Sequence, residues 1–269
     1  MTAQQPPPAV EVEIYLDLES LSQAAARSFL ACARRAVADA GVFCVALSGG
    51  TTPRRLYQIL ASPPLLDQVP WRQTHLFWSD ERGVPADAPE SNYGLAARLL
   101  LQPGQLPAER IHPMEGDADD LEAACTRYQE TLRRIACTEG RAPFCLDLVL
   151  LGMGADGHTA SLLPGSGAIR ERDRLVVVTR GGSPITDRMT LTLAAINRSR
   201  RVMVLLAGAA KAAILARVLT GEPDPNNVPA TGLAPRHGTL VWMVDRAAAA
   251  ALPDVLLRGV TVRRADVLA

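Results

Sequence analysis

The chain has 269 residues, of which 48% are hydrophobic, and this length and composition suit a single α/β domain with a large buried core. Its 28 basic residues balance its 28 acidic residues, which argues against a dedicated nucleic-acid or membrane surface. The five cysteines form no C-x-x-C pair, so neither a disulfide framework nor a zinc site is expected.

The first ten residues lack the basic start and apolar core of a signal peptide, and no apolar run approaches membrane-spanning length. Reduced cysteines in the cytoplasm fit this pattern. We therefore expect a disordered N-terminal tail over residues 1–9, followed by one domain over residues 10–269, with no bound metal.

Strand and helix signals alternate along the chain. Strands are expected at residues 10–16, 42–47, 75–78, 146–151, 175–179, 188–193, 202–206 and 240–244, with a terminal segment around Val260. Helices are expected from Ser20 to Ala40 with Gly41 as terminator, from Pro53, at 91–101, from Asp117 or Asp119 to Ala136, at 209–220, and briefly from Arg246. This alternation predicts a mostly parallel, doubly wound α/β sheet with helices on both faces.

A run of small residues follows the predicted strand at 42–47: Ser48, Gly49, Gly50, Thr51 and Thr52. Pro53 suits the first turn of a helix, because it lacks an N–H that would go unbonded there. Backbone N–H groups and hydroxyls at a helix N-terminus favour an anion such as phosphate. The run lacks the spacing of nucleotide P-loops, and an ordinary capped turn is the alternative.

Three charged residues follow the strand at 75–78: Asp80, Glu81 and Arg82. Asp80 or Glu81 could orient a base or bind hydroxyls, whereas the guanidinium of Arg82 matches a phosphate or carboxylate. A solvated turn is the alternative.

The strand at 146–151 ends in a loop that carries Gly152, Gly154, Gly157 and His158. Glycines let a ligand approach the backbone, and the free N–H groups of such a loop can bind anionic oxygens. Because histidine exchanges protons near neutral pH, His158 is the candidate general base. The other histidines, His75, His112 and His237, lack this loop context.

The letters GMGADG at residues 152–157 also satisfy the dinucleotide pattern G-x-G-x-x-G. That pattern needs a helix opening at its third glycine, but Pro164 and Gly165 interrupt the segment after that glycine. The next strand ends in Thr179 and Arg180 rather than in the acidic residue that would hold a ribose. We therefore expect no dinucleotide cofactor.

Lys211 is the only lysine among the 28 basic residues. It follows the strand at 202–206 and lies in the first turn of a helix, where the helix dipole disfavours a cation unless an anion is bound. Lys211 is therefore a candidate phosphate ligand, and a surface lysine that covers apolar atoms with its stem is the alternative.

These four loops share one property, because each follows the carboxyl end of a predicted strand. In an open parallel sheet such ends line one edge, where ligands bind. The sequence thus predicts one site with a phosphate-binding loop, two cations, a carboxylate and a histidine.

Six motifs, in this order over most of the chain, closely resemble those of the 6-phosphogluconolactonases of the pentose phosphate pathway: LSGGTTP, WSDERGVP, SNYG, LGMGADGHTASLLPG, RMTLTLAAINRSR and LAGAAKAAIL. The resemblance implies the fold shared with glucosamine-6-phosphate deaminases and related to ribose-5-phosphate isomerase. It also implies hydrolysis of 6-phospho-D-glucono-1,5-lactone to 6-phosphogluconate without a required cofactor.

The resemblance assigns roles to several residues of this chain. His158 matches the general base, Asp80 and Arg82 match the D-E-R motif, and Lys211 matches a lysine near the substrate phosphate, while residues 48–51 match the glycine-rich loop. Three further residues are candidates for substrate binding: Gly157, Thr159 and Arg188. Residues 181–184 and 230–232 match the family less well, which leaves the role of Arg188 open.

The expected mechanism begins with the phosphate held by residues 48–51 and by Lys211, Arg82 or both. His158 then removes a proton from the water that attacks the lactone carbonyl, and later returns it to the leaving ring oxygen. Asp156 or Asp80 orients the imidazole. No serine nucleophile is needed, because the chain has no G-x-S-x-G elbow at Ser48 or Ser161.

Two alternatives remain. A deaminase or isomerase of the same fold would carry a glutamate five positions after the histidine, where this chain has Leu163, and D-E-Y in place of the motif ending in Arg82. A non-catalytic sugar-phosphate sensor would need an added DNA-binding module, for which there is no room before Val10 or after Val262. The expected partner is therefore a small sugar-phosphate lactone, with neither nucleic acid nor membrane, and the oligomeric state stays open.

Overall fold

A computed structural model describes residues 9–136, 144–182 and 185–254 of the protein. Within these residues, six strands form one fully parallel sheet, which confirms the predicted architecture. In spatial order they are β1 (Ala9–Tyr15), β9 (Thr239–Asp245), β8 (Arg201–Leu206), β5 (Leu148–Leu151), β2 (Phe43–Leu47) and β3 (Thr74–Trp78).

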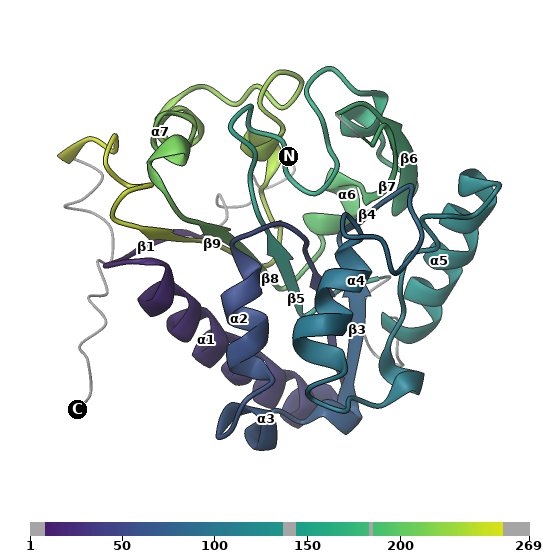
Figure 1. Ribbon diagram of the computed structural model, residues 1–269. Helices are drawn as coiled ribbons and strands as arrows, with labels where there is room; N and C mark the ends of the chain where they lie inside the picture. Colours follow the sequence, from purple (N-terminus) through teal and green to yellow (C-terminus); the bar gives the residue numbers. More distant parts are fainter. Residues whose placement is uncertain (1–8, 137–143, 183–184, 255–269) are drawn as a thin grey trace, which may run out of the picture.

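A second, antiparallel sheet lies beside the carboxyl end of β3 and next to α5 (Figure 1). It consists of β4 (Asp80–Arg82), β7 (Asp187–Leu191) and β6 (Val176–Arg180). The strands expected near 175 and 188 lie in this second sheet and not in the parallel one. They instead pair antiparallel with each other, and β7 also pairs with β4, with Asp80 opposite Thr190.

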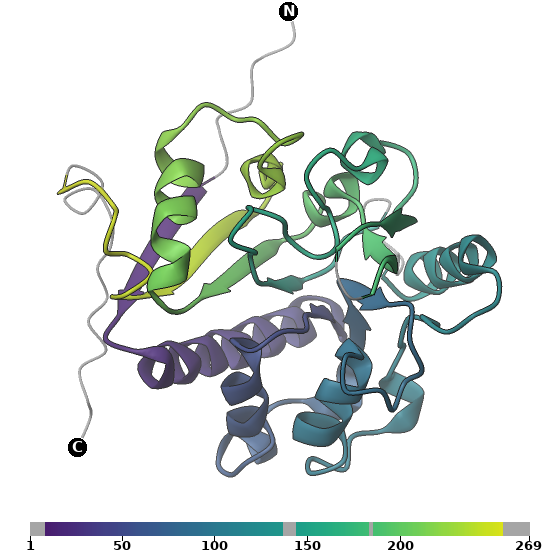
Figure 2. The same ribbon diagram turned by 45° about the horizontal axis from the view of Figure 1, so that its top comes forward.

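Helices cover both faces of the parallel sheet, with α1 along one face and α7 over the other (Figure 2). The α-helices of the described residues are α1 (Leu18–Ala40), α2 (Pro53–Leu60), α3 (Leu65–Gln68), α4 (Asn92–Ala96), α5 (Leu121–Ala136), α6 (Leu193–Ile196) and α7 (Ala212–Thr220). Shorter helical segments are η1 (Trp71–Gln73), η2 (Ala97–Leu101), η3 (Ala108–Arg110), η4 (Gly167–Arg170), η5 (Ala209–Lys211) and η6 (Pro229–Gly232).

The first helix begins earlier than the sequence suggested. Its N-cap is Asp17, not Ser20: the Asp17 carboxylate accepts the Ser20 N–H at 2.8 Å, and the Ser20 hydroxyl accepts the Asp17 N–H at 3.1 Å. This reciprocal pair is a capping box, so Ser20 lies one turn inside the helix. Gly41 ends α1 as predicted, at a φ of 71° that favours glycine.

Two other boundaries were predicted wrongly. Helix α5 begins at Leu121, after Asp120, and not after Asp117 or Asp119 as expected. The Asp120 carboxylate caps the helix, because it accepts the Ala123 N–H of the first turn at 3.0 Å. Residues 246–251 form turns instead of a short helix.

The ends of the expected domain are only partly visible. Strand β1 begins at Ala9, one residue before the expected start, and residues 1–8 of the expected tail lie outside the described residues. The terminal segment around Val260 also lies outside them.

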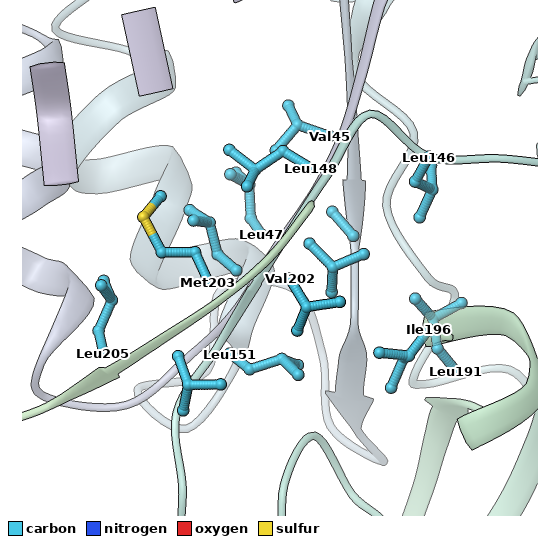
Figure 3. Packing of buried hydrophobic residues seen from close by; sticks show 14 of the residues in the cluster. Val45, Leu47, Leu146, Leu148, Leu151, Leu191, Ile196, Val202, Met203 and Leu205 are labelled. Carbon is cyan, nitrogen blue, oxygen red and sulfur yellow. The ribbon is translucent and has the colours of Figure 1, made fainter. Parts of the chain in front are cut away.

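The core lies on both faces of the parallel sheet, and every residue of β2 and β5 is buried. Met203 and Leu205 of β8 point to one side of the sheet, whereas Val202 points to the other, where Leu191 and Ile196 lie (Figure 3). Full burial of such a side chain contributes about 1.5–3 kcal/mol, so the central strands hold the edge of the site in a fixed position.

The strand order reverses between β2 and β5, at the centre of the sheet. From β2 the chain proceeds outward to β3, whereas from β5 it proceeds the other way, to β8 and then β9. Loops at the carboxyl ends diverge at such a reversal and leave a crevice where ligands bind in open α/β sheets.

Candidate active site

A cavity of about 230 Å³ lies at this reversal, and all four predicted loops contribute to it. Its lining residues are Ser48, Gly49, Gly50, Thr51, Thr52, Pro53, Asp80, Arg82, Asn92, Gly152, Met153, Gly154, His158, Ala160 and Lys211. Eight of the predicted site residues are thereby brought together: Ser48, Gly49, Gly50, Thr51, Asp80, Arg82, His158 and Lys211. The lining does not include four others: Asp156, Gly157, Thr159 and Arg188.

The glycine-rich loop after β2 is hydrogen-bonded to the side chain of Tyr57 on α2. The Tyr57 hydroxyl donates to the Ser48 carbonyl at 2.6 Å and accepts the Ser48 N–H at 3.1 Å, and burial raises the pKa of Tyr57. The hydroxyl of Ser48 is buried and has no hydrogen-bond partner among the described residues. Thr52, before Pro53, makes no side-chain capping bond, which favours an anion site over an ordinary capped turn.

Gly49 is needed because Asn92 and Arg82 approach its backbone. A Cβ at Gly49 would lie 1.6 Å from Asn92 Oδ1 and 3.0 Å from Arg82 Nη1. Asn92 Oδ1 accepts from Arg82 Nη1, while Asn92 Nδ2 donates to the Asp80 carbonyl at 2.8 Å. Asn92 was missed as a site residue in the sequence, and the only signal for it was the SNYG motif.

The three charged residues after β3 have separate surroundings. The Glu81 carboxylate accepts hydrogen bonds from the N–H groups of Asn92 and Tyr93 at the start of α4, at 2.8 and 2.7 Å. These bonds lower the pKa of Glu81, but burial has the larger effect and raises it. Arg82 Nη1 donates to the Glu90 carbonyl at 2.9 Å and faces the cavity. Asp80 and Glu81 are only 5% and 2% exposed, so the alternative of a solvated turn is wrong.

Asp80 connects this strand to the loop that carries the histidine. Its Oδ2 accepts from the fully buried Ser161 hydroxyl at 2.6 Å, and the Ser161 N–H donates to Thr190 Oγ1 on β7 at 3.1 Å. The antiparallel sheet therefore fixes the loop after β5 relative to Asp80.

His158 lies beside Asp156, the other candidate partner of its ring. The distance from His158 Nδ1 to Asp156 Oδ1 is 2.6 Å, and the His158 N–H donates to the same oxygen at 3.2 Å. Partial burial alone would raise the pKa of Asp156, but the backbone N–H and the ring of His158 outweigh it and lower that pKa. With Nδ1 facing a carboxylate, Nε2 is the nitrogen available for proton exchange.

Gly154 permits this arrangement, since a Cβ there would lie 2.2 Å from His158 Nδ1. Residues 158–166 form turns and an isolated bridge rather than a helix. The loop thus lacks the helix that a dinucleotide site requires, as the sequence predicted.

Three of the predicted residues that do not line the cavity, Gly157, Thr159 and Arg188, lie in the segments that form it or in the adjacent small sheet. Thr159 is fully buried and donates to the Gly152 carbonyl at 2.9 Å, while Gly157 has a φ of 83°. Arg188 lies opposite Arg82 in the small sheet and donates to the Ile185 carbonyl at 3.2 Å. Burial and the neighbouring Arg82 lower the pKa of Arg188.

Lys211 ends the turn η5 and is the N-cap residue of α7. It is partly buried and lines the cavity, and within the described residues no carboxylate lies within ion-pair distance of it. This favours the anion-binding interpretation over that of a surface lysine.

The described residues contain neither a metal-binding cluster nor a membrane-spanning helix. No three histidine, cysteine or acidic side chains gather there in a way that could hold a metal ion. None of the helices in the same residues is long and apolar enough to cross a membrane.

Residues 16–242 match the family model of glucosamine-6-phosphate isomerases/6-phosphogluconolactonase. A 6-phosphogluconolactonase of Mycobacterium tuberculosis is 41% identical over 248 residues, covering 90% of this chain and 98% of the relative. The structure of 6-phosphogluconolactonase from Trypanosoma brucei superposes with a TM-score of 0.78 at 28% identity, over 91% of this chain and 100% of that one. A monomeric glucosamine-6-phosphate deaminase, 24% identical, shares the fold with a TM-score of 0.77 over 90% of this chain and 99% of its own.

Proposed function

The chain belongs to the family of glucosamine-6-phosphate isomerases and 6-phosphogluconolactonases, and we propose that it acts there as a lactonase. It hydrolyses 6-phospho-D-glucono-1,5-lactone to 6-phosphogluconate. The observation that carries the mechanism is the pairing of His158 with Asp156 at a cavity that also holds an anion-binding loop and two cations.

The phosphate of the substrate binds at the N-terminus of α2. The buried, unpartnered hydroxyl of Ser48 and the backbone of the glycine-rich loop supply donors there. Lys211 and Arg82 line the same cavity and neutralise the phosphate charge between them. Binding through the remote phosphate fixes the lactone carbonyl near His158.

His158 acts as a general base on water. Asp156 holds the ring through Nδ1, so Nε2 takes a proton from the water as its oxygen attacks the lactone carbonyl. The carbonyl oxygen becomes an oxyanion that nearby N–H groups or a cation stabilise. When the intermediate collapses, the bond from the carbonyl carbon to the ring oxygen breaks, and the protonated His158 returns its proton to that oxygen.

Leu163 separates this activity from that of a deaminase. Leu163 stands where the deaminases carry a glutamate. Its side chain is buried, with 9% exposure, and packs near Gly181, where an added Cβ would lie 3.0 Å from Leu163 Cδ1. An aliphatic side chain in that place cannot transfer a proton, so aldose–ketose isomerisation lacks one of its groups. The balanced charge and odd number of cysteines support action in the cytoplasm on a small sugar phosphate, without a nucleic-acid or membrane partner.

The test compares two substrates on the purified protein. Acid release from freshly made lactone and ammonia release from glucosamine 6-phosphate are followed separately. We expect hydrolysis of the lactone well above its spontaneous rate and no ammonia. An unaccelerated lactone reaction would reject the proposed function, and a protein that binds the lactone without hydrolysing it would be a sensor.

The role of His158 is tested with His158→Ala against His237→Ala. His237 is exposed and lies at the opposite edge of the sheet, in the turn before β9. General-base catalysis contributes about 10²–10⁴-fold, so His158→Ala should lower kcat by that factor and leave product binding intact. His237→Ala should keep the wild-type kcat, and equal rates for the two variants would refute the assignment.

A further inference from the structure

Asp245, the last residue of β9, has a buried carboxylate that binds two separate loops. It is 8% exposed, and its oxygens each lie 3.0 Å from the N–H nitrogen of Gly208, in the loop after β8. Oδ1 also accepts the Ala248 N–H at 2.7 Å, in the turn after β9. A carboxylate that accepts from backbone N–H groups makes stronger hydrogen bonds than a neutral acceptor does.

Gly208 connects Asp245 to the cavity. The Gly208 carbonyl accepts the Lys211 N–H at 3.0 Å and so closes the turn η5, at whose end Lys211 enters the site. Gly208 has a φ of 95°, and a Cβ there would meet no atom within 4 Å. The positive φ, and not a lack of space, therefore favours glycine at this position. The bonds from Asp245 tie the Gly208 N–H to β9 and restrain the turn.

From this continuous chain of bonds we infer that Asp245 is a positioning residue for Lys211. The Asp245 carboxylate fixes the Gly208 N–H, Gly208 fixes the backbone of Lys211, and the ammonium is thereby held at the cavity. A cation at the N-terminus of α7 opposes the helix dipole, so before an anion binds the dipole disfavours Lys211 at the cavity and the anchored turn counteracts it. The inference rests on the proposed function only in taking the anion to be the substrate phosphate.

Asp245→Asn is the informative substitution, because it keeps the size of the side chain. Asparagine has one acceptor oxygen and an NH₂ group, so it cannot accept from both Gly208 and Ala248 without turning a donor toward an N–H. We expect the turn to loosen, the KM for the lactone to rise about tenfold, and kcat to change by less than about threefold. The dissociation constant of inorganic phosphate, measured by calorimetry, should rise by a similar factor.

The matched control is Asp147→Asn. Asp147 is 4% exposed and its carboxylate also accepts a backbone N–H, that of Cys44 at 2.8 Å, but it precedes β5 at the opposite edge of the same sheet. A purely structural loss should lower the midpoint of urea unfolding in both variants. Only Asp245→Asn should change KM and the binding of inorganic phosphate.

A double-mutant cycle with Lys211→Met decides whether Asp245 acts through Lys211. In the Lys211→Met background, Asp245→Asn should have no further effect on KM or on phosphate binding. Equal effects in both backgrounds, or unchanged KM and phosphate binding in Asp245→Asn, would overturn the inference. Because phosphate binding needs no turnover, a failure of the proposed activity is distinguishable from a failure of the positioning role.

Gly208→Ala serves as a second variant if Asp245→Asn does not fold. It disturbs the other end of the same hydrogen bond through the backbone conformation alone, since the added Cβ lies in open space. We expect the same rise in KM and the same dependence on Lys211. A Gly208→Ala protein with wild-type KM would contradict the inference.

Discussion

The ring of His158 and the carboxylate of Asp156 form a pair two residues apart in one loop, with Nδ1 and Oδ1 separated by 2.6 Å. Because Asp156 also accepts the His158 N–H, the same carboxylate fixes both the backbone and the ring of the histidine. The lowered pKa of Asp156 keeps it ionised at neutral pH, where it stabilises the imidazolium that forms during turnover.

Asp156→Asn should therefore impair turnover rather than binding. The amide cannot compensate the positive charge of the protonated ring and can turn its NH₂ toward it, so we expect kcat to fall about 10- to 100-fold with KM nearly unchanged. Asp187→Asn is the matched control, since the side chain of Asp187 is similarly exposed and pairs with Arg180 at 2.9 Å outside the cavity. A drop in kcat of the same size in both variants would show that the pair has no special role.

The sequence predicted the parallel sheet and the convergence of four loops, because buried apolar runs and the residues that end them are local patterns. It did not predict the second sheet, since the strand at 187–191 looks the same whether its partner is parallel or antiparallel. The pairing of β7 with the three residues of β4 depends on how the chain turns after β3, and no local sequence pattern predicts that turn.

Within the site, the sequence could identify which residue types gather but not their mutual contacts. Asp156 and Asp80 remained equivalent as partners of His158, and only the turn at Gly154 brings Asp156 to the ring while Asp80 binds Ser161. Asn92 was missed because an asparagine side chain does not by itself suggest a catalytic or charged binding role. Its place in the site follows from the close approach of its amide to the backbone of Gly49, which the sequence does not reveal.

Gly49→Ala tests that close approach. The new Cβ would overlap Asn92 Oδ1 and crowd the guanidinium of Arg82, so both side chains must shift from their present places in the cavity wall. We expect the KM for the lactone to rise at least about tenfold, with a loss of about 1–3 kcal/mol in the free energy of unfolding. Gly167→Ala is the control, since its Cβ would meet no atom within 4 Å and should leave both quantities unchanged.

Tyr57→Phe tests the support beneath the phosphate-binding loop. The variant loses the bonds of the hydroxyl to the carbonyl and N–H of Ser48 and leaves these buried backbone groups without that partner. The free energy of unfolding should fall by about 1–3 kcal/mol, measured by urea denaturation. KM should rise in the same variant, because the loop that ends in Thr51 becomes less ordered. A stability loss with wild-type KM would place Tyr57 outside phosphate binding.

A histidine pair remote from the cavity should make the stability depend on pH. His75 Nδ1 lies 2.8 Å from His112 Nε2, and Arg110 Nη1 lies 2.5 Å from His75 Nε2. Burial first, and then the charges of Arg110 and Arg134, lower the pKa of each histidine to about 4, with His112 adding to the effect on His75. Both rings are therefore neutral in the folded protein at pH 6.

Unfolding returns the two rings to the ordinary histidine pKa of about 6.5, so between that value and pH 4 the unfolded chain binds more protons than the folded one. The stability contribution is fully present above pH 6.5 and is lost as the pH falls toward 4. The midpoint of urea unfolding should decline over this interval. His112 stacks on Phe77, so phenylalanine at this position can keep a ring contact while carrying no titrating proton. His112→Phe should therefore flatten the decline, and an unchanged slope in that variant would exclude the pair as its source.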